Sequence, residues 1–395
     1  MNKFRRIAIA LYLCLAILSN HQAMGRERAI WVTRWDYKNA DEIAAVMENA
    51  KNLGASDVLF QVRGNAAVSY PSKIEPWAWE LTGTTPANLG VDPGWDPLQT
   101  AIEEAQKRKL GLHAWINVFP GWRGLQSAPA GSNHVWMKHR SWFMIDQRGK
   151  MLLPSETFYS FLSPGQPDVR AHLAALCGEM AKSYPGLAGV HLDYVRYPAL
   201  NEVGNFRDFS YDDASVKNFT AQYGKKPRFD LPEWQQFKRD QVTASIRAIR
   251  EAIQRSSPTM QLSATFAAEI NKATSEVGQD PKTWFSENLV DWAAPMAYER
   301  DVPSFRKTLK SLENYFTSEQ MQKLTVGVNV DFNSVYTIGK QLESVFASNS
   351  GGEILFAYSS LYPIHRSTPK AKAVQSLWRE ERLKEVILQS LHPTK

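Results

Sequence analysis

Residues 186–198, with the sequence GLAGVHLDYVRYP, form the stretch that decides the fold. The run 188–192 is apolar enough to be a strand buried on both faces, as in a parallel sheet covered by helices. Asp193 and Arg196 follow at its C-terminal end. In a barrel of alternating strands and helices, that edge is where catalytic groups collect, whereas the opposite edge serves stability. We therefore expect Asp193 to be a catalytic residue.

Strand-like runs alternate with amphipathic helical stretches along almost the whole chain of 395 residues, which is typical of a parallel α/β fold. The expected strands are 29–35, 57–62, 110–118, 188–192, 261–266, 290–298, 324–330 and 353–358. The expected helices are 40–53, 97–108, 168–183, 231–255, 302–316, 335–347 and 370–389. Eight strands that alternate with helices favour a closed (β/α)8 TIM barrel over a doubly wound sheet. No glycine-rich phosphate loop follows the first strand, as a doubly wound nucleotide-binding fold would need.

Three long insertions, 64–96, 120–165 and 197–230, each follow an expected strand. On a barrel, these βα-loop insertions would stack over one face and build walls around a cleft. Residues 26–395 contain no fixed repeat and no linker that would mark a second domain. We therefore expect one barrel domain over 26–395.

The first 25 residues have the features of a signal peptide. Lys3, Arg5 and Arg6 precede the apolar run 7–18, and small residues near Gly25 would suit cleavage. We expect a mature start near Arg26, export to the periplasm or the extracellular space, and no stable membrane insertion after cleavage. The apolar run is short for a transmembrane helix, and an uncleaved anchor is the alternative interpretation.

The charge balance bears on possible partners. The formal net charge of +6 includes three cations in residues 1–25 and no acidic residue there, so the expected mature chain carries 6 − 3 = +3. This mild excess suits an anionic polymer or surface without demanding one. The basic residues are dispersed among acidic ones, so we do not expect nucleic acid as a partner.

Tryptophans suggest the class of ligand. Nine of them lie in the first 150 residues, at expected strand ends or in the long loops: Trp31, Trp35, Trp77, Trp79, Trp95, Trp115, Trp122, Trp136 and Trp142. Flat aromatic faces in an open cleft are suited to stacking on pyranose rings. A core role is equally open for Trp31 and Trp115, whereas loop positions favour sugar contact for Trp77, Trp79 and Trp122.

Carboxylates at other expected strand ends could complete a glycosidase site. Such a site holds two carboxyl groups across the scissile bond, one as acid and one as nucleophile or base. We expect Asp193 as nucleophile or electrostatic stabiliser, and Glu299 or Glu269 as general acid. The alternatives are an Asp193 locked to Arg196 or to a backbone turn, and solvated loop carboxylates at Glu299 and Glu269. Asp331 fits a structural or substrate-orienting role.

The expected substrate-binding residues are polar or aromatic side chains near the same strand ends. They are Asp36, Arg63, Trp77, His113, Trp115, Asn117, Tyr194, Arg196 and Tyr298. A satisfied core histidine is the alternative for His113. The scattered histidines show no paired ligand spacing, so we expect neither a metal nor another cofactor.

Six motifs, in order along the chain, resemble those of glycosyl hydrolase-like family 10. They are RAIWVT at 28–33, FQVRG at 60–64, SYPSKIEPW at 69–77, LHAWIN at 112–117, GVHLDYVRYP at 189–198 and DWAAPMAY at 291–298. The resemblance spans residue 27 to the last expected strand. It implies a TIM-barrel hydrolase, often exported, with Asp193 in the catalytic position and a carbohydrate as substrate. It also implies peptidoglycan glycan strands as one candidate polymer.

One position departs from the family pattern. Many relatives carry a second Asp beside the carboxylate of the fourth strand, whereas this chain has Tyr194. The second catalytic group would then come from another strand.

The sequence as a whole predicts hydrolysis of glycosidic bonds in an extended extracellular or cell-wall polysaccharide. A secreted glycan-binding protein without turnover is one alternative. A polysaccharide deacetylase, which normally needs a metal or a Ser/His pair, is another.

Overall fold

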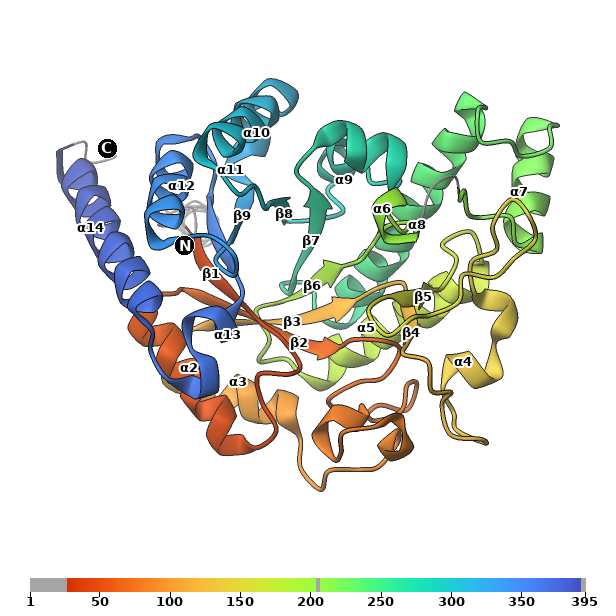
Figure 1. Cartoon of the computed structure of the whole chain (residues 1–395), viewed down its shortest axis with the longest axis horizontal. Coiled ribbons are helices and arrows are strands. Elements are labelled where there is room, and N and C mark those ends of the chain that lie inside the picture. Colours follow the sequence, from red (N-terminus) through yellow and green to blue (C-terminus); the bar gives the residue numbers. More distant parts are fainter. Residues whose placement is uncertain (1–26, 204–206, 392–395) are drawn as a thin grey trace, which may run out of the picture.

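The computed structural model describes residues 27–203 and 207–391, with side chains described as far as residue 385. The expected signal peptide and Arg26 lie outside the described residues. Eight parallel strands close into a barrel (Figure 1), which confirms the predicted (β/α)8 fold. The strands are β1 Glu27–Val32, β2 Asp57–Arg63, β3 Gly111–Asn117, β6 Gly189–Asp193, β7 Gln261–Ala267, β8 Trp292–Ala297, β9 Thr325–Asn329 and β10 Gly352–Phe356. Strand β1 pairs with β10 and with β2, which closes the ring.

Helices surround the barrel on its outside (Figure 1). The main ones are α2 Ala40–Leu53, α3 Pro97–Lys107, α5 Pro167–Ser183, α8 Pro232–Ser256, α10 Val302–Tyr315, α12 Val335–Ala347 and α14 Pro369–Leu391. Helix α2 shows why the sequence forms them: Asn39 caps its N-terminus by accepting from the N–H of Glu42, and Gly54 ends it with φ of 98°. Between β7 and β8 the structure adds a π-helical turn, Lys272–Glu276, and a short helix α9, Pro281–Ser286, that the sequence did not predict.

The three long insertions follow β2, β3 and β6, as expected, and contain small elements of their own. These are η2 Trp79–Leu81, η3 Pro86–Asn88, the antiparallel hairpin of β4 Pro120–Arg123 and β5 Tyr159–Phe161, α4 Val135–Lys138, η4 Arg140–Trp142, α6 Leu200–Val203 and α7 Asp213–Tyr223. The remaining short helices are α11 Ser318–Gln322, between α10 and β9, and α13 Tyr358–Leu361 and η6 Pro363–His365, which follow β10.

Side chains alternate between the two faces of each strand, and this alternation decides which residues enter the barrel. On β6, Val190 and Leu192 belong to the hydrophobic layer between strands and helices. A separate cluster inside the barrel contains Trp31, Trp115 and Trp292, together with Ala29, Leu59, Ala294 and Ile354. His191 stacks on Trp292 within this interior, at 5.4 Å between ring centroids. Asp193, two residues further along β6, therefore points into the barrel, above these packed interior side chains.

In the part of the chain that the structure describes, no helix is both long and apolar enough to cross a membrane.

Candidate active site

The carboxylate of Asp193 lies at the C-terminal end of β6, with only 8% of the residue exposed. Thr265 on the neighbouring strand β7 donates to its Oδ1 at 2.8 Å, and the backbone N–H of Tyr194 donates to the same oxygen at 2.7 Å. Both of these hydrogen bonds engage Oδ1. Asp193 lines a cavity of about 440 Å³.

The backbone leaves β6 by an unusual turn at Tyr194, whose φ is 50°. A bulky residue rarely adopts this left-handed conformation, and such strain gathers at functional sites. The turn directs the Tyr194 N–H back to Asp193 and places the tyrosine ring beside Tyr159, at 5.6 Å between centroids. Tyr194 thus fixes the rotamer of Asp193 and forms part of the cavity wall.

Burial raises the pKa of Asp193 above its ordinary value. The hydrogen bonds from Thr265 and from the Tyr194 backbone, and the charge of Arg196, act in the opposite direction without cancelling the effect of burial. A carboxyl group in such an environment is kept ready to hold and donate a proton.

Aromatic side chains form the walls around Asp193. Trp31, Trp35 and Trp115 all line the cavity, as does Tyr298, which stacks on Phe356 at 5.6 Å between ring centroids. The indole N–H of Trp115 is close enough to Asp193 to lower the pKa of that carboxyl group.

Arg34, which the sequence did not indicate as a site residue, brings a guanidinium group to the cavity. Its Nε donates to Glu80 at 2.8 Å, its backbone N–H donates to Gln61 at 3.1 Å, and one terminal nitrogen donates to Tyr159 at 3.3 Å. Glu80 and Tyr159 come from two different insertions, so no local pattern links them to Arg34. Only the position of Arg34, two residues beyond β1, could have indicated its role.

Arg196 and Asn117 also line the cavity, as expected for substrate-binding residues. Arg196 forms a two-pronged ion pair with Glu202, at 2.8 and 2.7 Å, and its guanidinium carbon lies 4.7 Å from the centroid of the Tyr194 ring. It is therefore not locked to Asp193. Asn117 accepts from the side-chain amide of Gln61 at 3.1 Å.

Arg63 does not line this cavity, and the reason lies in its partners. Its Nε and one terminal nitrogen both donate to Glu75 at 2.7 Å, and the other terminal nitrogen donates to the backbone carbonyl oxygen of Val118 at 3.1 Å. Both members of the pair have fully buried side chains. The expected role of Arg63 in substrate binding is thus replaced by a structural one.

His113 and Trp77 also lie outside the cavity. His113 sits four residues below Asn117 on β3, where its Nε2 lies 3.3 Å from a carboxylate oxygen of Asp57 at the start of β2. This matches the alternative of a core histidine. Trp77 is half-buried in the first insertion. The other two loop tryptophans expected to contact sugar, Trp79 and Trp122, are core residues.

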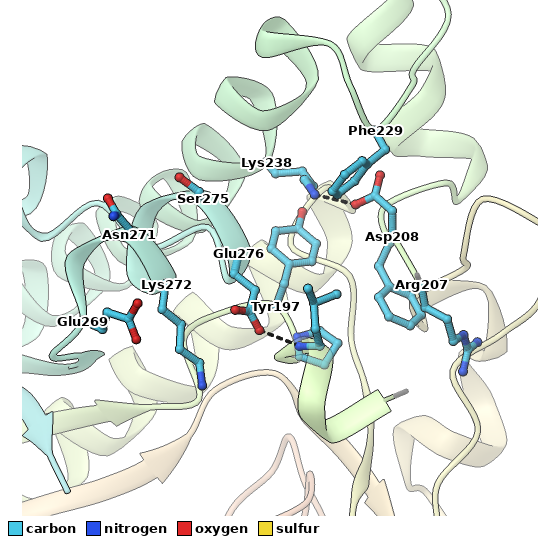
Figure 2. A pocket seen from close by; sticks show the side chains of 13 residues that line it. Tyr197, Arg207, Asp208, Phe229, Lys238, Glu269, Asn271, Lys272, Ser275 and Glu276 are labelled. Atoms are coloured by element: carbon cyan, nitrogen blue, oxygen red, sulfur yellow. Dashed lines mark hydrogen bonds and ion pairs between the residues drawn. The ribbon is translucent and has the colours of Figure 1, made fainter. Parts of the chain in front are cut away.

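The two glutamates expected to partner Asp193 are not among the residues that line its cavity. Glu299 follows Tyr298, and since Tyr298 faces the cavity, Glu299 points the other way, where Thr308 of α10 donates to its Oε1. Its pKa is raised by burial. Glu269 lines a different cavity, of about 290 Å³, together with Lys272 and Phe229 (Figure 2).

Asp36 lies next to the Asp193 cavity rather than in it. Its Oδ2 accepts from the backbone N–H and the hydroxyl of Thr33, at 2.7 and 2.9 Å. Burial raises its pKa. It lines a neighbouring cavity together with Asp331. Among the described residues, no group of three or more His, Cys, Asp or Glu side chains is placed to hold a metal ion.

Glycosidases of known structure share the closed barrel. The β-galactosidase from the psychrophilic Marinomonas ef1 is similar, with a TM-score of 0.65 at 12% identity over 91% of this chain and 60% of that chain. The catalytic domain of β-amylase from Paenibacillus polymyxa gives 0.58 at 10% identity, over 90% of this chain and 98% of that chain. At these identities the likeness shows the fold alone.

The chain belongs to the family Glycosyl hydrolase-like 10, whose model matches residues 26–346. It is 25% identical to "Glycosyl hydrolase YngK" of Bacillus subtilis over 314 residues, which are 72% of this chain and 56% of that protein. It is 28% identical to "Glycosyl hydrolase DigH" of Escherichia coli over 284 residues, which are 64% of this chain and 56% of that protein. The chain spans about half the length of these curated relatives. Family and fold together support a glycan-related function and a carbohydrate ligand.

Proposed function

We propose that this protein is a glycoside hydrolase that cleaves O-glycosidic bonds in an extended polysaccharide. The observation that carries the proposal is Asp193. Its carboxyl group is buried, is held in one rotamer by Thr265 and the Tyr194 N–H, and lines a cavity walled by aromatic rings. Aromatic walls with a few fixed polar groups suit a sugar, which has both apolar faces and hydroxyl edges.

In this mechanism Asp193 is the proton donor, in place of the nucleophile or electrostatic stabiliser expected from the sequence. Burial raises its pKa, which favours the protonated form that a general acid needs. The proton passes from Asp193 to the glycosidic oxygen, the bond from that oxygen to the anomeric carbon breaks, and water adds its hydroxyl to the carbon. The proton that water releases restores Asp193 through solvent.

Other cavity residues would stabilise and orient the sugar. The π faces of Trp115 and Tyr298 can stabilise positive charge that develops on the ring as the bond breaks. Arg34 and Asn117 can bind sugar hydroxyl groups, and both are held in place by Gln61.

A second function, glycan binding without turnover, is favoured by one observation. Asp193 is the only carboxylate among the described residues that line its cavity. Most glycosidases place two carboxyl groups about 5 to 10 Å apart across the scissile bond. A single carboxylate could grip hydroxyl groups without completing a reaction.

We further propose that the protein is exported and acts on cell-wall polysaccharide, with peptidoglycan glycan strands as the candidate polymer. The basic segment followed by an apolar run in residues 1–25 supports export. The small positive charge of the remaining chain is compatible with an anionic cell wall.

The test is incubation of the purified protein with a panel of polysaccharides that includes bare peptidoglycan strands. New reducing ends and products identified by mass spectrometry are expected from the wild type. Asp193→Asn should lose at least a hundredfold in rate, since removing a general acid costs roughly 10² to 10⁴. Asp41→Asn, which alters an exposed carboxylate in the first turn of α2, is the matched control. Saturable binding with no products would overturn hydrolysis in favour of binding alone.

A further inference from the structure

A second cavity, of about 600 Å³, adjoins the one that contains Asp193. The two share Thr33, Trp35 and Phe356 in their linings, so they are direct neighbours over the ends of β1 and β10. A polymer that places one bond at Asp193 must lay its neighbouring units along the surface next to that cavity. The direction in which it leaves Asp193 is therefore a property of the surrounding surface.

Trp35 stands at the junction between the two cavities and is 51% exposed, unusual for so large an apolar side chain. The guanidinium carbon of Arg34 lies 4.5 Å from the centroid of its ring. Because Glu80 holds that guanidinium, the indole is fixed by a cation–π contact rather than by burial. A rigid exposed aromatic face can stack on a sugar with little loss of conformational entropy.

Polar groups surround this aromatic face on the far side from Asp193. The carboxylate of Asp36 is oriented by Thr33, and that of Asp331 accepts from the Ser360 hydroxyl. His365 is held by Tyr358, whose hydroxyl lies 2.9 Å from Nδ1. Carboxylate acceptors beside hydroxyl donors match the hydroxyl groups along a sugar edge.

The rim of this second cavity is also conformationally strained. Ile364 has φ of 50° and ψ of 38°, and it is 86% exposed. A β-branched residue in this left-handed region is a true outlier, and such outliers cluster at ligand-binding segments.

From these observations we infer that the cavity bounded by Trp35, Asp36 and His365 is a second sugar-binding subsite, and that the glycan runs from Asp193 across Trp35 toward α13 and η6. This inference rests on the proposed glycan substrate. The competing path leads to the cavity of Glu269, where Phe229 is the exposed aromatic residue (Figure 2).

The test measures binding rather than turnover, in the Asp193→Asn background, by calorimetry with two-sugar and six-sugar fragments of bare peptidoglycan strands. Adding Trp35→Ala should weaken the six-sugar fragment about tenfold and the two-sugar fragment by less than about threefold, because one stacking contact contributes on the order of a factor of ten. A general structural defect would weaken both fragments alike. Phe229→Ala is the matched control and should change neither affinity.

The outcomes separate this inference from the proposed function. Equal losses for both fragments, or no preference of the parent for the longer one, would overturn the subsite. A length-dependent loss in Phe229→Ala instead of Trp35→Ala would also overturn it and favour the path toward Glu269. Length-dependent binding through Trp35, combined with a wild type that releases no products, would support the subsite and overturn hydrolysis.

Discussion

Thr265 donates a hydrogen bond to Asp193 from the adjacent strand, at 2.8 Å, and the bond favours the charged form of that carboxyl group. Thr265→Val removes the donor while keeping the shape of the side chain. The pKa of Asp193 should then rise further. Because the protonated form is the active one in our mechanism, the alkaline limb of the kcat/KM profile should move to higher pH.

The control for this experiment is Thr265→Ser, which keeps the hydroxyl and should restore the wild-type profile. A shift of the alkaline limb to lower pH would contradict the role of Asp193 as proton donor. A fall in activity with no shift would mean that Thr265 only shapes the cavity.

The buried carboxylate of Asp193 should also lower the free energy of unfolding at neutral pH. Its folded pKa is raised above the unfolded value, so the stability linked to its proton is present at low pH and is lost as pH rises through the folded pKa. Asp193→Asn keeps both hydrogen-bond donors supplied with an acceptor. We expect it to raise the free energy of unfolding at pH 7 by on the order of 1 kcal/mol. Denaturant titrations at several pH values should show this gain shrinking toward pH 3, and a constant difference would argue against it.

Arg63 should matter for stability rather than for substrate binding. Arg63→Met leaves the buried carboxylate of Glu75 without its main partner, which typically costs about 3 to 5 kcal/mol in the free energy of unfolding. The double variant Arg63→Met with Glu75→Leu should recover much of this loss, since no charge then stays buried. Urea unfolding measures both. An Arg63→Met variant of unchanged stability and raised KM would instead favour direct substrate contact.

His134 should make the fold sensitive to mild acid. Its Nε2 lies 2.9 Å from the carbonyl oxygen of Asn65, while its Nδ1 accepts from the N–H of Trp136 at 3.0 Å. Burial lowers its pKa to about 4, so it stays neutral in the fold.

The depressed pKa fixes the sign of this effect. The contribution of neutral His134 to the free energy of unfolding is fully present above its unfolded pKa and is lost as pH falls through its folded pKa. About 3 kcal/mol should therefore be lost between roughly pH 6.5 and pH 4. His134→Gln should lose less over that window when unfolding is followed in both proteins. Parallel pH profiles would show that His134 is not the titrating group.

Glu299 and Glu269 should be dispensable for catalysis. Glu299 accepts from Thr308 and Glu269 lines another cavity, so neither carboxylate lines the cavity of Asp193. Glu299→Gln and Glu269→Gln should each keep kcat/KM within about threefold of wild type, whereas loss of a general acid costs roughly 10² to 10⁴. A large loss in either variant would restore that residue as the partner of Asp193.

The barrel could be predicted from the sequence because its signals are local. The strands are short, mostly apolar runs, and four of the main helices, α2, α3, α10 and α12, begin at a residue whose side chain caps the N-terminus, as Asn39 does for α2. The predicted bounds of α2 and α12 agree with the structure. Short elements such as α9 escaped prediction because one turn of helix depends on packing more than on sequence pattern.

The candidate site could be predicted only in part, because a position at a strand end does not by itself show whether the side chain faces into the barrel or out of it. Alternation along β8 sends Tyr298 inward and therefore Glu299 outward, a distinction that counting residues could have made. On β2 an irregularity in pairing between Gln61 and Arg63 breaks that alternation, and no sequence pattern reveals it. His113 also faces into the barrel, but it lies four residues before Asn117 on β3 and is therefore too far below the cavity to line it.

Arg34 has a consequence for how such proteins can diverge or be engineered. It is held by Glu80 from one insertion and by Tyr159 from another, so these two loops are tied through a single guanidinium. Grafting one loop from a relative would leave the Arg34 guanidinium without one of these two acceptors, unless the grafted loop supplied a matching one. Residues 64–96 and 120–165 would therefore have to be transplanted together, and mutations that retune one should be accepted only alongside compensating changes in the other.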